Sequence, residues 1–75
     1  MEERLLSDAT KFFLARLRKL RKKERLGWHE YRHEAMQKEF RSRIRKLVKG
    51  RLTQKKLVNI ANYCNFLWIN LEIWK

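Results

Sequence analysis

The scarcity of chain-breaking residues most limits what this sequence can fold into. Its 75 residues contain no proline and only two glycines, Gly27 and Gly50. An all-β protein needs turn residues at short intervals, so this composition argues against a β-sandwich or barrel. The glycines divide the chain into three segments, and each carries apolar residues at helical spacing. The sequence therefore predicts a single all-α domain over residues 1–75, a helical bundle. The expected helices cover about 3–25, 28–49 and 53–74.

The first segment has the pattern of an amphipathic helix, with apolar residues three or four apart. These residues are Leu6, Ala9, Phe13, Leu17 and Leu20. The second half of this segment is rich in arginine and lysine, which suits the negative end of a helix dipole. Gly27 and Gly50 are stop signals for the first two helices. Thr53 is expected to cap the third helix, because its hydroxyl can accept an otherwise unpaired backbone N–H.

The third segment is apolar on two sides. One stripe is predicted to be the core of the chain and comprises Leu57, Ile60, Ala61, Cys64, Leu67, Trp68, Leu71 and Trp74. The opposite stripe is predicted to be the interface of a homodimer and comprises Val58, Asn62, Phe66, Ile69 and Ile73. A helix that is apolar on both sides is buried on both sides, and a chain this short usually needs a staple such as a second subunit. Asn62 would either fix the pairing register or lie at the edge of the contact.

The charge balance predicts a polyanionic partner. Lys and Arg number 20 against 8 Asp and Glu, giving a formal net charge of +12. A single cysteine, Cys64, provides no disulfide framework, and the first residues lack the pattern of a signal peptide, so a cytoplasmic protein is expected. The longest uncharged run, Leu57 to Leu71, is too short and too polar to span a bilayer, and no membrane partner is expected.

The basic residues form two clusters that are predicted to bind nucleic acid. The first cluster comprises Arg16, Arg18, Lys19, Arg21, Lys22, Lys23 and Arg25. The second cluster comprises Arg41, Arg45, Lys46, Lys49, Arg51, Lys55 and Lys56, with Arg43 in the same run. No acidic residue lies between Glu39 and Glu72. Like charges on a helix repel, and phosphates relieve that repulsion. A charged surface of thermophilic type is the alternative, but it predicts more glutamate.

The expected binding mode is contact with the phosphates of duplex DNA or structured RNA. No helix-turn-helix pattern is present, so base-specific readout is not predicted. Trp28 and Tyr31 lie near the first cluster. They would either stack on bases or pack in the core, and packing in the core is the favoured alternative.

Residues 29–33 read His-Glu-Tyr-Arg-His, which matches the H-E-x-x-H pattern of zinc peptidases. On a helix, His29 and His33 would share one side. A catalytic zinc of this class needs a third protein ligand, however, and Arg32 would repel the metal. The sequence therefore favours ordinary helix histidines, and neither a metal nor a cofactor is predicted. Cys64, set in an apolar stripe, is interpreted as an inert core residue.

Residues 59–71, Asn-Ile-Ala-Asn-Tyr-Cys-Asn-Phe-Leu-Trp-Ile-Asn-Leu, resemble the last core helix of the MazG-like all-α nucleotide pyrophosphohydrolases. In that family an acidic E-x-x-D precedes an Ala-Asn-aromatic segment, and paired acidic motifs hold magnesium against a nucleoside triphosphate. The resemblance implies a helical oligomer. Lys56 and Asn59 stand where the family has carboxylates, so the resemblance implies a member without catalysis.

Four functions are compatible with this sequence to different degrees. The leading one is a small dimeric protein that binds nucleic acid as a regulator or accessory subunit. The second is a helical adaptor whose basic face docks an acidic protein. An enzyme, zinc-dependent or MazG-like, is not expected. Binding to anionic lipid ranks last, because core packing explains the apolar stripes better.

Overall fold

The chain folds into three α-helices in a computed structural model, which describes residues 2–25 and 30–74. Helix α1 covers Glu2–Arg25, α2 covers Met36–Val48 and α3 covers Gln54–Ile73. One turn of 3-10 helix, η1, covers Glu30–Arg32 and precedes α2. No strand occurs in the two described stretches, so the predicted all-α class with three helices is confirmed.

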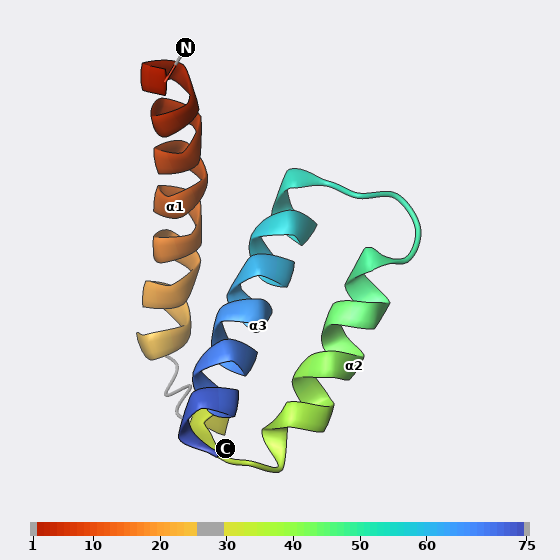
Figure 1. The fold of residues 1–75 in the computed structure, drawn as a ribbon. Coiled ribbons are helices and arrows are strands. Elements are labelled where there is room, and N and C mark those ends of the chain that lie inside the picture. The colour runs from red at the N-terminus through yellow and green to blue at the C-terminus, as the bar shows by residue number, and fades with distance from the viewer. Residues whose placement is uncertain (1, 26–29, 75) are drawn as a thin grey trace.

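Helix α3 is the central element of the fold. It packs against both α1 and α2, and η1 also contacts it (Figure 1). Helices α2 and α3 run antiparallel, whereas α1 runs in the same direction as α3 (Figure 1). The first half of α1 rises beyond the start of α3, and residues 3–14 are exposed. None of the helices in the described stretches is long and apolar enough to cross a membrane.

The predicted bounds are confirmed for α1 and α3 but are wrong for α2. The predicted helix at 28–49 begins eight residues later, at Met36. Side chains at the C-terminal end of α3 donate to three carbonyls just before α2, and the His33 carbonyl also accepts from the Met36 backbone N–H at 2.9 Å. Asn70 Nδ2 donates to the Tyr31 and His33 carbonyls, each at 2.7 Å, and Trp74 Nε1 donates to the Arg32 carbonyl at 2.7 Å. These tertiary bonds hold the segment in a 3-10 turn and delay the α-helix.

The core is small and aromatic. Among the described residues, two hydrophobic side chains are buried, Phe40 of α2 and Phe66 of α3, with ring centroids 5.6 Å apart. The Tyr31 ring stacks on Phe66 with centroids 5.1 Å apart, and Tyr63 meets Phe66 edge-on at 6.2 Å. Such aromatic pairs add to the stabilisation from burial. One cluster of rings therefore joins η1, α2 and α3.

The predicted assignment of the two faces of α3 is wrong. Asn62 and Phe66, predicted to bind a second subunit, are buried within the chain. Val58 and Ile69 are half-buried, and Ile73 is exposed. On the stripe predicted to be core, Leu57, Cys64, Trp68, Leu71 and Trp74 are exposed, whereas Ile60, Ala61 and Leu67 are half-buried. The face containing asparagines lies inside because their amides satisfy buried polar groups, which the pattern of apolar residues does not reveal.

Two predicted end signals are confirmed at the junction of α2 and α3. Gly50 adopts φ +76°, a left-handed conformation that glycine tolerates at little cost. The Thr53 hydroxyl accepts a hydrogen bond from the Lys56 backbone N–H at 3.1 Å and caps α3. Gly27, the other predicted stop, lies outside the described residues.

Candidate nucleic-acid interface

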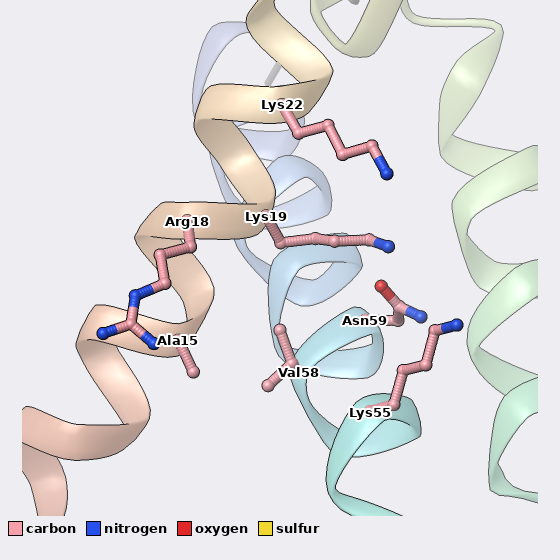
Figure 2. A pocket seen from close by; sticks show the side chains of 7 residues that line it. All are labelled: Ala15, Arg18, Lys19, Lys22, Lys55, Val58 and Asn59. Atoms are coloured by element: carbon pink, nitrogen blue, oxygen red, sulfur yellow. The ribbon is translucent and has the colours of Figure 1, made fainter.

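Part of the first basic cluster lies along the side of α1 that faces α3. Lys19 is half-buried, while Arg18 and Lys22 are exposed. Helix α1 places Lys19 and Lys22 three residues apart, so their side chains leave the helix on the same side. Figure 2 shows both side chains extending from α1 in the same direction.

These side chains border a hollow between α1 and α3, which we call the basic hollow. It has a volume of about 330 Å³ and is lined by Ala15, Arg18, Lys19, Lys22, Lys55, Val58 and Asn59. Lys55 belongs to the second cluster, so the fold brings members of both clusters together. Figure 2 shows Lys55 extending from α3 on the same side as Lys19 and Lys22, with the Asn59 amide among them, whereas Arg18 extends in another direction from α1.

The basic hollow contains four cationic side chains and no carboxylate among its lining residues. The two ion pairs found within the described stretches lie elsewhere, between Lys11 and Asp8 at 4.0 Å and between Arg43 and Glu39 at 2.9 Å. Lysines brought together in this way repel one another unless an anion separates them. The hollow is therefore a region of concentrated positive potential.

Arg16 has a structural role rather than a place in the basic hollow. Its Nε donates to Asn62 Oδ1 at 3.0 Å, and Asn62 Nδ2 donates to the Arg16 carbonyl at 3.3 Å. Two reciprocal bonds of this kind fix α1 to α3. Arg16 is half-buried, and its guanidinium Nε is bonded to Asn62.

The remaining members of the first cluster are placed differently. Lys23 lies over the ring of Tyr63, with Nζ 5.2 Å from the centroid, which is a cation–π contact. Arg21 is exposed and borders, with Lys23 and Glu24, a separate hollow whose lining includes Phe66 and other apolar residues. The side chain of Arg25 lies outside the described residues.

Most of the second cluster lies on α2 and the turn that follows it. Arg41 and Arg45 border a third hollow together with Lys38 and Glu34, so a carboxylate accompanies them there. Lys46, Lys49 and Arg51 are exposed. The Lys56 ammonium donates to the Arg51 carbonyl at 2.9 Å and to the Lys49 carbonyl at 3.5 Å, and so supports the turn. Apart from Lys55, the structure does not bring this cluster into the basic hollow.

Arg43 is tied to α3, and its surroundings change its pKa. The side-chain hydrogen bond to Glu39 raises the pKa of the Arg43 guanidinium, while burial acts in the opposite direction and Tyr63 adds to the increase. Arg43 Nη1 donates to the Tyr63 hydroxyl at 3.3 Å, and its guanidinium lies 5.5 Å from the centre of that ring. Arg43 therefore links α2 to α3 and is not part of the basic hollow.

The histidine motif does not have the geometry that the sequence suggested. His33 is exposed and lies between η1 and α2, so the expectation that it belongs to the second α-helix is wrong. His29 and Trp28 lie outside the described residues. Within the described stretches, no three His, Cys, Asp or Glu side chains are grouped as metal ligands would be. Tyr31 stacks on Phe66, which confirms its interpretation as a packing residue.

Two lining residues of the basic hollow were missed as candidates. Asn59 provides an amide that can donate to a phosphate oxygen, and Ala15 leaves space beside Arg18. The spacing of Lys55 and Asn59, four residues apart on one helix, was a usable signal for Asn59. No such signal existed for Ala15, because its position depends on how α1 packs against α3.

Comparisons with known proteins found no relative of this chain. No protein-family model matches the chain, and no similar chain was found among curated proteins or among solved structures. The resemblance of residues 59–71 to the MazG-like family therefore stays a prediction.

Proposed function

We propose that this protein binds nucleic acid by contacting its phosphate backbone, with the basic hollow as the central contact. The observation that carries the proposal is the convergence of Lys19, Lys22 and Lys55 on a hollow lined by no carboxylate. A polyanion presents several phosphates in a row, and each phosphate neutralised by a cation releases counterions. A chain of net charge +12 favours such a ligand over a small anion.

The proposed ligand is duplex DNA or structured RNA, recognised without base readout. Lysines contact phosphates as point charges and carry no sequence information. The exposed cations Arg41, Arg45 and Lys46 would extend the contact at the periphery. We propose a regulator or accessory subunit that acts in the cytoplasm as a homodimer, in which each cluster occurs twice.

We also propose that the protein is not an enzyme. Lys56 and Asn59 stand where the MazG-like pattern has metal-binding carboxylates. Lys56 is bonded to the Lys49 and Arg51 carbonyls, and Asn59 lines the basic hollow. Neither residue supplies a carboxylate, the protein ligand through which magnesium is usually held.

A salt titration tests the proposal. Binding to duplex DNA, single-stranded DNA and RNA is measured in parallel by fluorescence anisotropy at increasing salt. Log affinity should fall linearly with log salt, by about 0.9 per neutralised phosphate on duplex DNA, and two unrelated duplex sequences should bind alike. Absence of binding to all three ligands at low salt would contradict the proposal.

A second candidate, a helical adaptor that binds another protein, is favoured by one observation. The outer side of α3 exposes Leu57, Trp68 and Leu71, which are residues typical of protein interfaces when they are grouped. An adaptor of this kind would bind no nucleic acid at low salt, so the same titration separates the two functions.

A further inference from the structure

Opposite the buried Asn62, Phe66 and Asn70, α3 carries an apolar stripe that the rest of the chain covers only in part, which we call the outer face. It comprises the exposed residues Leu57, Cys64, Trp68 and Leu71 and the half-buried residues Ile60, Ala61 and Leu67. Leu57 also borders a hollow beside α1. Trp68 is 64% exposed, Leu71 51% and Leu57 43%. These positions recur at intervals of three and four, so they form one stripe about 21 Å long. A contiguous apolar surface of this kind on a small chain marks a contact site.

The charge distribution points to a second copy of this chain as the occupant. No Asp, Glu, Lys or Arg occurs from Leu57 to Leu71, in a chain of net charge +12. Two copies can therefore meet through the outer face without placing cation against cation. An acidic protein or an anionic lipid surface would be attracted to the basic clusters, and the outer face offers neither ligand a complementary charge.

The outer face is also complementary to itself. Its residues are placed symmetrically about Cys64, with Leu57 and Leu71 seven residues away, Ile60 and Trp68 four away, and Ala61 and Leu67 three away. Two antiparallel α3 helices crossing at Cys64 would bring each residue against the one at the mirrored position. The large Trp68 ring would meet Ile60 and the small Ala61 of the second copy, and large-against-small contacts fill such seams well. Self-complementarity is what a two-fold interface requires.

The exposed area of the chain is large enough to form such an interface. The chain exposes 6510 Å². A compact protein of its 9.4 kDa mass exposes about 5000 Å². The excess is about 1500 Å², whereas a stable interface buries about 800 Å² on each partner. Residues 3–14 of α1 and the exposed residues of the outer face both contribute to the exposed area.

We propose that a second copy of this chain covers the outer face, with the two α3 helices antiparallel about a two-fold axis at Cys64. This replaces the predicted interface, whose Asn62 and Phe66 are buried within the chain. The proposal specifies the homodimer and does not depend on nucleic-acid binding. Its tests contain no nucleic acid, so its failure is distinguishable from failure of the proposed function.

The first test is the mass of nuclease-treated protein by sedimentation equilibrium at tens of micromolar. The wild type should have twice the chain mass of 9.4 kDa. Trp68→Glu should halve that mass, because it places a charge in the centre of the seam, and should keep its helical circular dichroism. The control Leu52→Glu changes a side chain that is 52% exposed and belongs to the turn before α3 rather than to the outer face, and it should remain dimeric. A monomeric wild type, or a dimeric Trp68→Glu variant, would overturn the proposal.

The second test establishes the orientation by disulfide formation. Mild oxidation of the wild type should join two chains through Cys64, because residues at the two-fold axis lie within disulfide distance. In a Cys64→Ser background, a Leu57→Cys chain should cross-link to a Leu71→Cys chain when the two are mixed, and neither should cross-link to itself. Self-cross-linking of Leu57→Cys would indicate parallel helices and overturn the proposed arrangement. A Cys64 that forms no disulfide dimer would also overturn it.

Discussion

Arg16 and Asn62, 46 residues apart in the chain, are hydrogen-bonded to each other in both directions. The guanidinium Nε of Arg16 donates to the Asn62 side-chain oxygen at 3.0 Å, and the Asn62 amide donates back to the Arg16 carbonyl at 3.3 Å. Asn62 is fully buried in this arrangement. The pair connects α1 to α3, together with the half-buried Leu17 and Leu20 and the contact of Lys23 with the Tyr63 ring. A basic residue that resembles a nucleic-acid contact in the sequence thus holds two helices together.

Asn62→Ala should lower the free energy of unfolding by about 1–3 kcal/mol, because it leaves a half-buried guanidinium and a carbonyl without their partner. Urea denaturation followed by circular dichroism measures this loss. Asn65→Ala, at a half-buried position on the same helix, is the matched control and should cost less. An equal loss in the two variants would show that the Arg16 bonds do not stabilise the fold.

Asn70→Asp should destabilise the fold in a pH-dependent manner. Asn70 is fully buried, and its amide nitrogen donates to the Tyr31 and His33 carbonyls. A carboxylate there would face two carbonyl oxygens, and burial raises the pKa of such a carboxyl. Its folded-state pKa then lies above its unfolded value, so the variant loses stability as the pH rises between the two.

The measurement for Asn70→Asp is the melting temperature at about pH 4 and pH 7, with the wild type at each pH as the reference. The deficit of the variant should be larger at pH 7. A deficit that is equal at both pH values would contradict a buried, ionisable side chain at this position.

The basic hollow is tested by two triple variants that remove the same charge. Lys19→Gln, Lys22→Gln and Lys55→Gln should weaken binding to all nucleic-acid sequences alike and reduce the salt slope by about 0.9 for each phosphate that is no longer neutralised. Arg41→Gln, Arg45→Gln and Lys49→Gln, on α2 and its C-terminal end, should have the smaller effect. Fluorescence anisotropy across a salt series gives both quantities. Equal effects would mean that net charge, and not the hollow, determines binding.

Gly50→Ala should cost about 1 kcal/mol of stability, because φ at this residue is +76° and a side chain disfavours that conformation. No atom lies within 4 Å of an added Cβ, so the loss comes from the backbone alone. Gly50→Asn should lose less, because asparagine tolerates left-handed conformations better than alanine. Thermal unfolding compares the two variants, and an asparagine variant less stable than the alanine variant would contradict this reason.

The local features of this fold were readable from the sequence. The spacing of apolar residues predicts α1 and α3 almost to their ends, and Gly50 and Thr53 mark the turn between α2 and α3. These signals act over a few residues: a backbone conformation that suits glycine, a hydroxyl beside a free N–H, and a repeat that matches the helical turn. The two basic clusters were equally evident, because each is a run of lysines and arginines in the sequence itself.

Only the tertiary structure decided which face of α3 lies inside, where α2 begins, and which lysines meet. Periodicity within one helix reveals two apolar stripes but does not show which of them is buried within the chain. The stripe with Asn62 and Asn70 is the buried one, because their amides donate to backbone carbonyls on α1 and just before α2. The bonds to the Tyr31, Arg32 and His33 carbonyls also postponed the start of α2. Lys55 joins Lys19 and Lys22 because α1 packs beside α3, and contacts between residues far apart in the chain leave no local pattern in a single sequence.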